Sequence, residues 1–334
     1  MTHPLRQITV GGRDTSCLGV GAMSFSDVWG TTTDANSLAV LDAAAEAGVT
    51  HIDTANIYGM GRSETVIGQW LAANQDLRDD MLIATKGGIT ADADGKRKFD
   101  NSPEHLEAEL DGSLKRLGLD YVDLYYVHRR EAAREIEEVT ETLARLIEKG
   151  KIRSFGFSEI APTSLCRAST IHPVAAVQSE YSLSARFSEL GLVQACEKLG
   201  TTMVAFSPVG RSWLTARPIP YDLAKDMFFA NVNPRFQRDN HARNMRATLA
   251  FRDLAAQAGE NPASLAIAWL LSQGDHVLPI PGTRSTEHFA HLVRGAKMKL
   301  GADLKAAIEE VLPVGWCHGD RYDVAQRIGP ENFC

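Results

Sequence analysis

Four side chains with complementary proton chemistry follow three successive apolar runs in the first 130 residues. Asp53 and Tyr58 lie in DTANIYG, Lys86 lies in IATKGG and His128 lies in LYYVHRR. Parallel strands end at the same edge of their sheet, so these four side chains would meet there. A carboxylate, a phenol, an ammonium and an imidazole together form a site for proton transfer to a small molecule.

The roles of the four groups follow from their ordinary acidities. A tyrosine with a pKa of about 10 is a poor acid at neutral pH. A neighbouring ammonium stabilises the phenolate, so Lys86, paired with Asp53, is expected to lower the pKa of Tyr58. Neutral His128 can donate a hydrogen bond to a carbonyl oxygen, which Tyr58 then protonates. Each residue alone has a common structural use, and their joint occurrence carries the prediction.

The elements that position these residues alternate between strands and helices. An opening hairpin is expected to turn at Gly11-Gly12. Strand-like runs lie near residues 17–22, 49–54, 81–85, 122–127, 152–157, 174–178, 202–206 and 277–280. Eight strand-plus-helix units predict an α/β fold, a (β/α)8 TIM barrel with large βα loops at its C-terminal face. One domain is expected over residues 1–334, with a long irregular loop over about 208–240 on the cofactor side.

Helix boundaries are marked by capping residues. Asp34 is expected to cap the first helix, and Ser102-Pro103 opens another that Gly118 ends. The next helix has one apolar face and is closed by Gly150; that face is formed by Ile136, Val139, Leu143, Leu146 and Ile147. Asn261-Pro262 opens a helix that runs to about Gln273.

Composition excludes several classes of partner. The net charge of −7 argues against nucleic acid, and no apolar run approaches the ~20 residues of a membrane span. Five scattered cysteines and a start without an apolar signal region favour reduced thiols and a cytoplasmic location. His288 and His291 share a helical face, but they lack a third ligand, so no metal is expected.

The flanks of the four residues resemble those of the aldo-keto reductase superfamily. The resemblance spans nearly the whole chain and appears in family order in DTANIYGMGRSETVIG, IATKGG, SLKRLGLDYVDLYYVHR, GKIRSFGFSE, VQSEYSL, AFSPVGR and LPIPGTRS. Within the superfamily it is similar to the bacterial and plant branch of auxin-induced-protein-like reductases. The resemblance implies NADPH-dependent reduction of an aldehyde or ketone by the tetrad, with NADH possible.

The resemblance also implies a set of cofactor contacts. Ser158 and Gln178 would contact the nicotinamide carboxamide, and Phe206 would stack on the ring. The pyrophosphate would lie along Ser207, Val209 and Arg211, and the adenosine 2′-phosphate region beside Gly282, Thr283, Arg284 and His288. A GTRS turn before a helix supplies backbone donors and a fixed cation, a combination suited to a phosphate.

Three positions depart from the family pattern. Glu159 replaces a frequent Asn and can accept from a carboxamide but cannot donate to it. His291-Leu292 stands where many members have a Glu-Asn pair that reaches the adenine, and Leu292 cannot hydrogen-bond. Phe206 replaces Tyr and keeps the aromatic face. These departures leave the preference for NADPH over NADH open.

The substrate pocket is less readable. Met23, Phe25 and Trp29 follow the first strand, and Tyr126 lies on the fourth; all four are candidates for an apolar wall, although barrel packing is the commoner role for such side chains. An aromatic pocket favours carbonyl substrates with a flat or apolar body. Two other functions stay open: a nucleotide-binding regulatory protein on the same barrel, and a dehydrogenase that oxidises an alcohol or sugar. The sequence assigns no oligomeric state.

Overall fold

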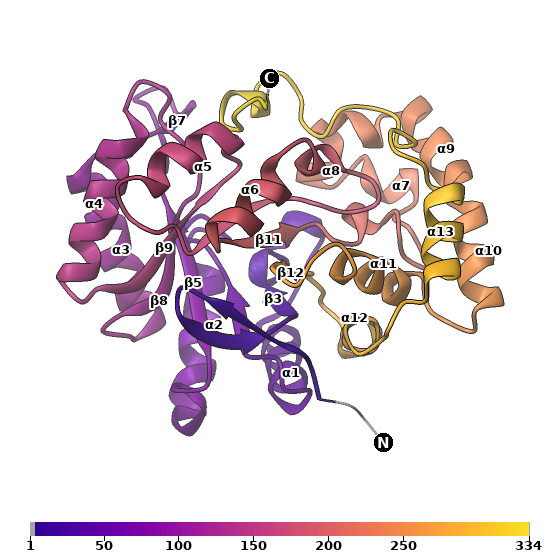
Figure 1. The fold of residues 1–334 in the computed structure, drawn as a ribbon, viewed down its shortest axis with the longest axis horizontal. Helices are drawn as coiled ribbons and strands as arrows, with labels where there is room; N and C mark the ends of the chain where they lie inside the picture. Colours follow the sequence, from indigo (N-terminus) through magenta and orange to yellow (C-terminus); the bar gives the residue numbers. More distant parts are fainter. Residues whose placement is uncertain (1–3, 334) are drawn as a thin grey trace.

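Eight parallel strands wind into a nearly closed barrel in the computed structural model, which describes residues 4–333 (Figure 1). In order around the barrel the strands are β3 (Gly19–Gly21), β4 (His51–Asp53), β5 (Leu82–Gly87), β8 (Val122–Val127), β9 (Ile152–Ser158), β10 (Ala176–Glu180), β11 (Thr202–Phe206) and β12 (Val277–Pro279). Strands β5, β8 and β10 are buried along their whole length, as parallel strands covered on both faces should be. All eight predicted strands are present, and the predicted TIM-barrel fold is confirmed.

The barrel closes at a seam between its first and last strands. The backbone N–H of Gly21 donates to the carbonyl of Pro281 at 2.9 Å. A Cβ at position 21 would lie only 2.4 Å from the Ile280 carbonyl oxygen, so this close approach requires glycine. Two loop contacts cross the seam on the C-terminal side: Ser24 Oγ donates to the Thr283 carbonyl at 2.9 Å, and Arg284 Nη1 donates to the Thr31 carbonyl at 2.8 Å.

Helices surround the barrel. They are α1 (Asp34–Glu46), α2 (Arg62–Ala73), α3 (Pro103–Leu117), α4 (Ile136–Glu148), α5 (Pro162–Ser169), α6 (Leu192–Leu199), α7 (Tyr221–Ala224), α8 (Phe228–Val232), α9 (Arg238–Ala247), α10 (Leu249–Gln257), α11 (Pro262–Leu271), α12 (Thr286–Ala296) and α13 (Ala302–Val311). Ser102 and Asn261 cap α3 and α11 as predicted. At α1 the prediction is one residue off, because Thr33 accepts from the Asn36 N–H and Asp34 is the first helical residue.

The predicted hairpin lies at the start of the chain. Strands β1 (Gln7–Val10) and β2 (Arg13–Ser16) pair antiparallel, and Gly11 and Gly12 between them both have positive φ. Gly11 lies against Ser154 and Ala175. Ile8 and Val10 join the apolar cluster inside the barrel, which also contains Leu124, Tyr126 and Val204. The hairpin therefore covers the N-terminal end of the barrel and leaves the C-terminal end for the site.

Two long segments lie at the C-terminal end. Segment 208–240 is less irregular than predicted, because it contains α7, α8 and the start of α9. Phe229 of α8 packs against Trp29, with ring centroids 5.1 Å apart, which ties the segment to the first loop. The chain that follows α13 is drawn in yellow in Figure 1 and crosses toward α5. We call residues 313–333 the tail. A small hairpin, β6 (Ile89–Ala91) with β7 (Arg97–Phe99), was not predicted. Between residues 4 and 333, no helix has the length and apolar content of a membrane span.

Candidate active site

The four predicted catalytic residues come together at the C-terminal ends of three neighbouring strands. Asp53 ends β4, Lys86 lies in β5 and His128 directly follows β8. Tyr58 lies in the loop between β4 and α2, and its ring meets the His128 ring edge-on with centroids 5.8 Å apart. We call these four residues the reaction centre.

Lys86 is the hub of the reaction centre. Its side chain is completely buried, and its ammonium donates to the Asp53 carboxylate, to the Thr54 carbonyl at 2.8 Å and to the Tyr58 hydroxyl at 3.5 Å. These three acceptors match the three hydrogens of an ammonium. The other Asp53 oxygen accepts from Gln178 Nε2 at 2.8 Å. The long contact to Tyr58 is typical of a catalytic hydrogen bond before substrate binds.

Burial and charge set the protonation states. Burial raises the pKa of Tyr58 and outweighs the lowering by Lys86, so the expected net lowering is not found and the phenol stays protonated at neutral pH. Burial likewise raises the pKa of Asp53 against the pull of Lys86. Burial lowers the pKa of Lys86, but Asp53 and Tyr58 raise it overall. Burial and the charges of Arg129 and Lys86 hold the pKa of His128 well below its usual value, which agrees with the neutral imidazole expected.

Two polar atoms of the site have no partner in the described chain. They are the buried His128 Nδ1 and the hydroxyl of Tyr126. The Tyr126 ring lies inside the barrel, 5.8 Å from Lys86 Nζ. A Cβ at position 156 would lie 2.6 Å from this ring, so Gly156 makes room for it. Unsatisfied buried polar groups are costly, and a bound ligand can supply the missing partner.

Backbone strain marks the same face. Five non-glycine residues have positive φ in the described chain, namely Met60, Glu159, Ser207, Arg211 and Ser212. Each lies in a loop that follows β4, β9 or β11 at the C-terminal end. Such conformations cost about 1–3 kcal/mol each and gather at functional sites. The strained positions thus gather at the same end of the barrel as the four side chains.

The residues expected at the nicotinamide lie beside the reaction centre. Ser158 ends β9 and accepts from Arg129 Nη1 at 3.0 Å. Gln178, on β10, is the second hydrogen-bond partner of Asp53 and thus joins the reaction centre to this region. Phe206 ends β11 and is partly exposed.

The residues expected along the pyrophosphate follow β11. Ser207, Gly210, Arg211 and Ser212 all have positive φ, and Val209 is partly exposed. Successive backbone N–H groups in such a turn form a concavity suited to an anion. The guanidinium of Arg211 is engaged elsewhere, because Nη2 donates to Glu180 at 2.7 Å and Nη1 donates to the Arg321 carbonyl at 2.7 Å.

The residues expected at the 2′-phosphate surround the start of α12. Gly282 and Thr283 precede Arg284, and Ser285 caps the helix by accepting from the His288 N–H. Arg284 and His288 are exposed. Among residues 4–333 Arg284 has no carboxylate partner, and its recorded contact is the Thr31 carbonyl.

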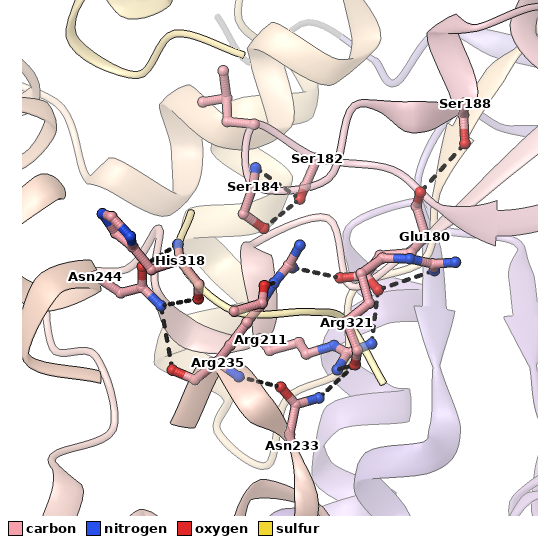
Figure 2. Close-up of polar contacts among 12 residues, drawn as sticks. Glu180, Ser182, Ser184, Ser188, Arg211, Asn233, Arg235, Asn244, His318 and Arg321 are labelled. Atoms are coloured by element: carbon pink, nitrogen blue, oxygen red, sulfur yellow. Dashed lines mark hydrogen bonds and ion pairs between the residues drawn. The ribbon is translucent and has the colours of Figure 1, made fainter. Parts of the chain in front are cut away.

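Glu159 belongs to a buried ionic network that sequence reasoning did not predict. Figure 2 shows the part of this network around Glu180, with Arg211, Arg235 and Arg321. We call the network formed by Glu159, Glu180, Arg211, Arg235 and Arg321 the arginine–glutamate cluster. Glu159 accepts from Ser179, from the Glu180 N–H and from Arg321, at 2.8 to 3.0 Å. Although burial raises its pKa, the charges of Arg321 and Arg129 lower the pKa of Glu159 to about 2.

Glu180 is the second acid of the cluster. It lies at the end of β10 and pairs with Arg211 at 2.7 Å and with Arg235 and Arg321 at 3.3 Å. Burial raises the pKa of Glu180, but the three arginines lower it overall. The cluster fastens segment 208–240 and the tail to the barrel strands.

The structure also places the residues expected near the adenine and those expected in the substrate pocket. Leu292 is buried in the core on the inner face of α12, and His291 is half-buried beside it. Phe25 is also fully buried in the core. Met23 and Trp29 stay partly exposed, and Trp29 packs against Phe229 and Phe236 of segment 208–240.

Comparison with known proteins identifies the family. The model of the aldo/keto reductase family matches residues 17–313. The chain belongs to this family. It is an NAD(P)H-dependent oxidoreductase, and the predicted family resemblance is confirmed.

Similar proteins cover the chain almost completely. It is 35% identical over 327 residues to the aldo-keto reductase yakc [NADP(+)] of Schizosaccharomyces pombe, covering 96% of this chain and 95% of that protein. It is 34% identical over 312 residues to probable aldo-keto reductase 1 of Glycine max, covering 93% and 89%. The glycerol dehydrogenase AKR11B4 from Gluconobacter oxydans shares the fold with a TM-score of 0.79 and 27% identity, over 92% of this chain and 94% of that one.

Proposed function

We propose that this aldo-keto reductase reduces an aldehyde or ketone to an alcohol with NADPH, using Tyr58 as the proton donor. The observation that carries the proposal is the position of Lys86, whose buried ammonium touches Asp53, the Thr54 carbonyl and the Tyr58 hydroxyl at once. This arrangement keeps a cation beside a protonated phenol. It stabilises the phenolate that forms when the proton leaves, which is the requirement of a general acid.

Each residue of the reaction centre has a separate task. A reduced nicotinamide, when bound, supplies the hydride to the carbonyl carbon. Neutral His128 donates a ring N–H to the carbonyl oxygen and orients it toward Tyr58. Tyr58 then gives its proton to that oxygen, and Lys86 stabilises the phenolate. Asp53 holds the ammonium in place, and Gln178 holds Asp53.

The cofactor residues fit a dinucleotide. Ser158 and Gln178 would hold the carboxamide, and Phe206 would offer an aromatic face to the ring. The backbone of Ser207, Val209 and Arg211 suits the pyrophosphate, since the Arg211 guanidinium is occupied by Glu180. Exposed Arg284, without a carboxylate partner in the described chain, suits the 2′-phosphate together with Gly282, Thr283 and His288 at the start of α12.

The substrate would enter beside the first loop. Met23 and Trp29 are partly exposed there, while Tyr126 is buried inside the barrel, with its ring 5.8 Å from Lys86 Nζ. Phe25 lies deeper in the core, where it supports this loop. A pocket of this composition accepts small carbonyl compounds with a flat body.

NADPH oxidation at 340 nm with 4-nitrobenzaldehyde tests the proposal. Wild type should turn over, and Tyr58→Phe should lose about 10²–10⁴ of the rate, because it keeps the ring and removes the general acid. NADPH binding, followed by fluorescence, should be unchanged in the variant. Equal rates for the two proteins would reject Tyr58 as the proton donor.

A second function is favoured by the likeness to a glycerol dehydrogenase. The same residues can oxidise an alcohol with NADP⁺ when Tyr58 is a phenolate, which accepts the hydroxyl proton while the hydride passes to NADP⁺, because a catalyst accelerates both directions. NADP⁺ reduction with glycerol and related alcohols measures this direction. A protein that binds NADPH but reduces no carbonyl and oxidises no alcohol would instead be a nucleotide-binding regulator.

A further inference from the structure

Arg129 is a buried cation without a carboxylate partner beside the reaction centre. It follows His128 directly, and only 8% of its surface is exposed. No ion pair joins it to an acid among residues 4–333, and its acceptors are all neutral: the His128 carbonyl at 2.6 Å, Ser158 Oγ at 3.0 Å and the Tyr322 hydroxyl at 3.3 Å. Burying an unpaired charge is expensive, so this arginine calls for a counter-ion.

The nearby acid does not fill this role. Glu159 lies within reach of the Arg129 charge, which helps to lower the pKa of that carboxyl. However, both Glu159 oxygens are taken by Ser179, the Glu180 N–H and Arg321. The arginine–glutamate cluster is therefore complete without Arg129.

One edge of the Arg129 guanidinium is held and the other is available. Nη1 donates to both the His128 carbonyl and Ser158 Oγ, which fixes the plane of the group. The opposite edge, made by Nε and Nη2, has the single 3.3 Å contact with Tyr322 among the described residues. Two parallel N–H donors on one edge of a guanidinium match the two oxygens of a carboxylate.

The surroundings of this edge lie at the mouth of the barrel. Gly329 of the tail packs against both Arg129 and Phe99, since a Cβ at position 329 would lie 2.9 Å from Arg129 Cδ and 2.8 Å from the Phe99 ring. Exposed Arg97 lies over Phe99, 5.3 Å from the ring centroid, and among residues 4–333 it too has no acid partner. A second cation and an aromatic ring thus accompany Arg129.

We propose that Arg129, with Arg97 nearby, forms a subsite for a carboxylate on the carbonyl substrate. The inference rests on the proposed function, because it names a substrate class for the same site: aldehydes and ketones that carry a carboxylate at their far end. The Nε–Nη2 edge of Arg129 binds the carboxylate in place of the weak Tyr322 contact. The adjacent His128 donates a hydrogen bond to the carbonyl oxygen, so neighbouring residues of one loop bind both ends of the substrate.

A matched pair of substrates tests the subsite. 4-Carboxybenzaldehyde and 4-nitrobenzaldehyde have nearly the same shape, but only the first is an anion. The ratio of their kcat/KM values is compared between wild type and variants, so that the difference in intrinsic reactivity cancels. Arg129→Met removes the charge and keeps the length of the side chain, and Arg129→Lys keeps the charge without the two parallel N–H donors. The control is Arg167→Met, because Arg167 is exposed and forms ion pairs with Glu135 and Glu137.

Arg129→Met should lower kcat/KM for the carboxylate by about ten- to a hundredfold, mainly through KM, because a charge-assisted pair is lost. The nitro compound should lose at least tenfold less than the carboxylate, since it shares only the effect of Arg129 on Ser158 and His128; Arg129→Lys should be intermediate and Arg167→Met should match wild type. Equal losses for both aldehydes, or weaker NADPH binding without selectivity, would assign Arg129 to orienting Ser158 and overturn the subsite. If Arg129→Met fails to fold, inhibition of wild type decides: benzoate should compete with aldehyde and benzamide should not.

A further measurement separates the subsite from the reaction. Calorimetry of the NADP⁺ complex with 4-(hydroxymethyl)benzoate and with 4-nitrobenzyl alcohol needs no turnover. Tighter binding of the carboxylate that is lost in Arg129→Met supports the subsite even if wild type reduces neither aldehyde, a result that would reject only the proposed function. Equal binding of the two alcohols by wild type would overturn the subsite.

Discussion

The reaction centre and the arginine–glutamate cluster are both buried, charged and placed at the mouth of one barrel, but they are built in opposite ways. The reaction centre comes from three neighbouring strands and leaves His128 Nδ1 without a partner. The cluster joins elements as far as 162 residues apart, and none of its buried polar side-chain atoms lacks a partner in the described chain. The unpartnered His128 nitrogen is thus free for a ligand, whereas the complete set of contacts in the cluster holds distant parts of the chain together.

Removal of the Lys86 ammonium should have the largest effect, and it should act on the reduction rate. Lys86→Met takes away the cation that contacts the Tyr58 hydroxyl, so the reduction rate should fall by about 10²–10⁴. Burial already raises the pKa of Asp53, which can take up a proton and remain in place. Steady-state kinetics measures the loss, and exposed Lys149→Met is the control. A loss below tenfold would place the source of catalysis elsewhere.

Arg321→Met should lower the stability of the protein and leave its reduction rate nearly unchanged. It leaves Glu159 buried without its cation, and breaking a buried pair costs about 3 kcal/mol of unfolding free energy or more. The tail should also loosen, so chymotrypsin, which cleaves after aromatic residues such as Trp316 and Tyr322, should cut it faster, while kcat for a neutral aldehyde changes much less than in Lys86→Met. Urea unfolding and timed proteolysis give the two readouts. The control is Arg327→Met, because Arg327 lies in the tail and forms an exposed ion pair with Asp320. Similar losses of stability in the two variants would contradict a special role for the cluster.

Acid should weaken the cluster within a defined window. The pKa of Glu159 is about 2 in the folded protein and about 4.5 when unfolded, so its contribution is complete above pH ~4.5 and is lost as the pH falls through about 2. The stability difference between wild type and Glu159→Gln should therefore shrink by on the order of 3 kcal/mol between these limits. Urea unfolding at several pH values measures it. A difference independent of pH would show that Glu159 is not held as a carboxylate.

The smallest expected effect concerns the edge of the cofactor site. Arg284→Ala should weaken NADPH binding about ten- to a hundredfold through loss of a charge-assisted contact, while NADH binding stays the same. Fluorescence titration with both cofactors measures the ratio. Equal weakening of both would mean that Arg284 supports the loop through its contact with the Thr31 carbonyl rather than reading a phosphate.

The two regions also differ in how far the sequence predicts them. Asp53, Lys86 and His128 follow short apolar runs, and the parallel barrel rule brings such positions together. The cluster offers no such signal, because Arg321 reaches Glu159 only after the tail has crossed the mouth. Glu159 was therefore interpreted as a possible carboxamide contact, while the structure pairs it within the protein. A hint lay in segment 208–240, where basic residues outnumber acidic ones.

Local signals had a similar limit. Ser102-Pro103 and Asn261-Pro262 mark helix starts because a cap and a proline act within one turn. Thr33 and Asp34 are both good caps, and only the backbone of the preceding loop decides between them. For Tyr58, composition could not weigh burial against the charge of Lys86, so the net direction of its pKa needed the structure.

The seam between β3 and β12 dictates the order in which this chain can fold. Ser24 and Thr283 touch across it, yet they are 259 residues apart in the sequence. Contacts of such separation form late, so the first barrel strand has an unpaired edge until the last one has been synthesised. During synthesis this exposed edge of β3 is the part of the molecule most open to pairing with another chain.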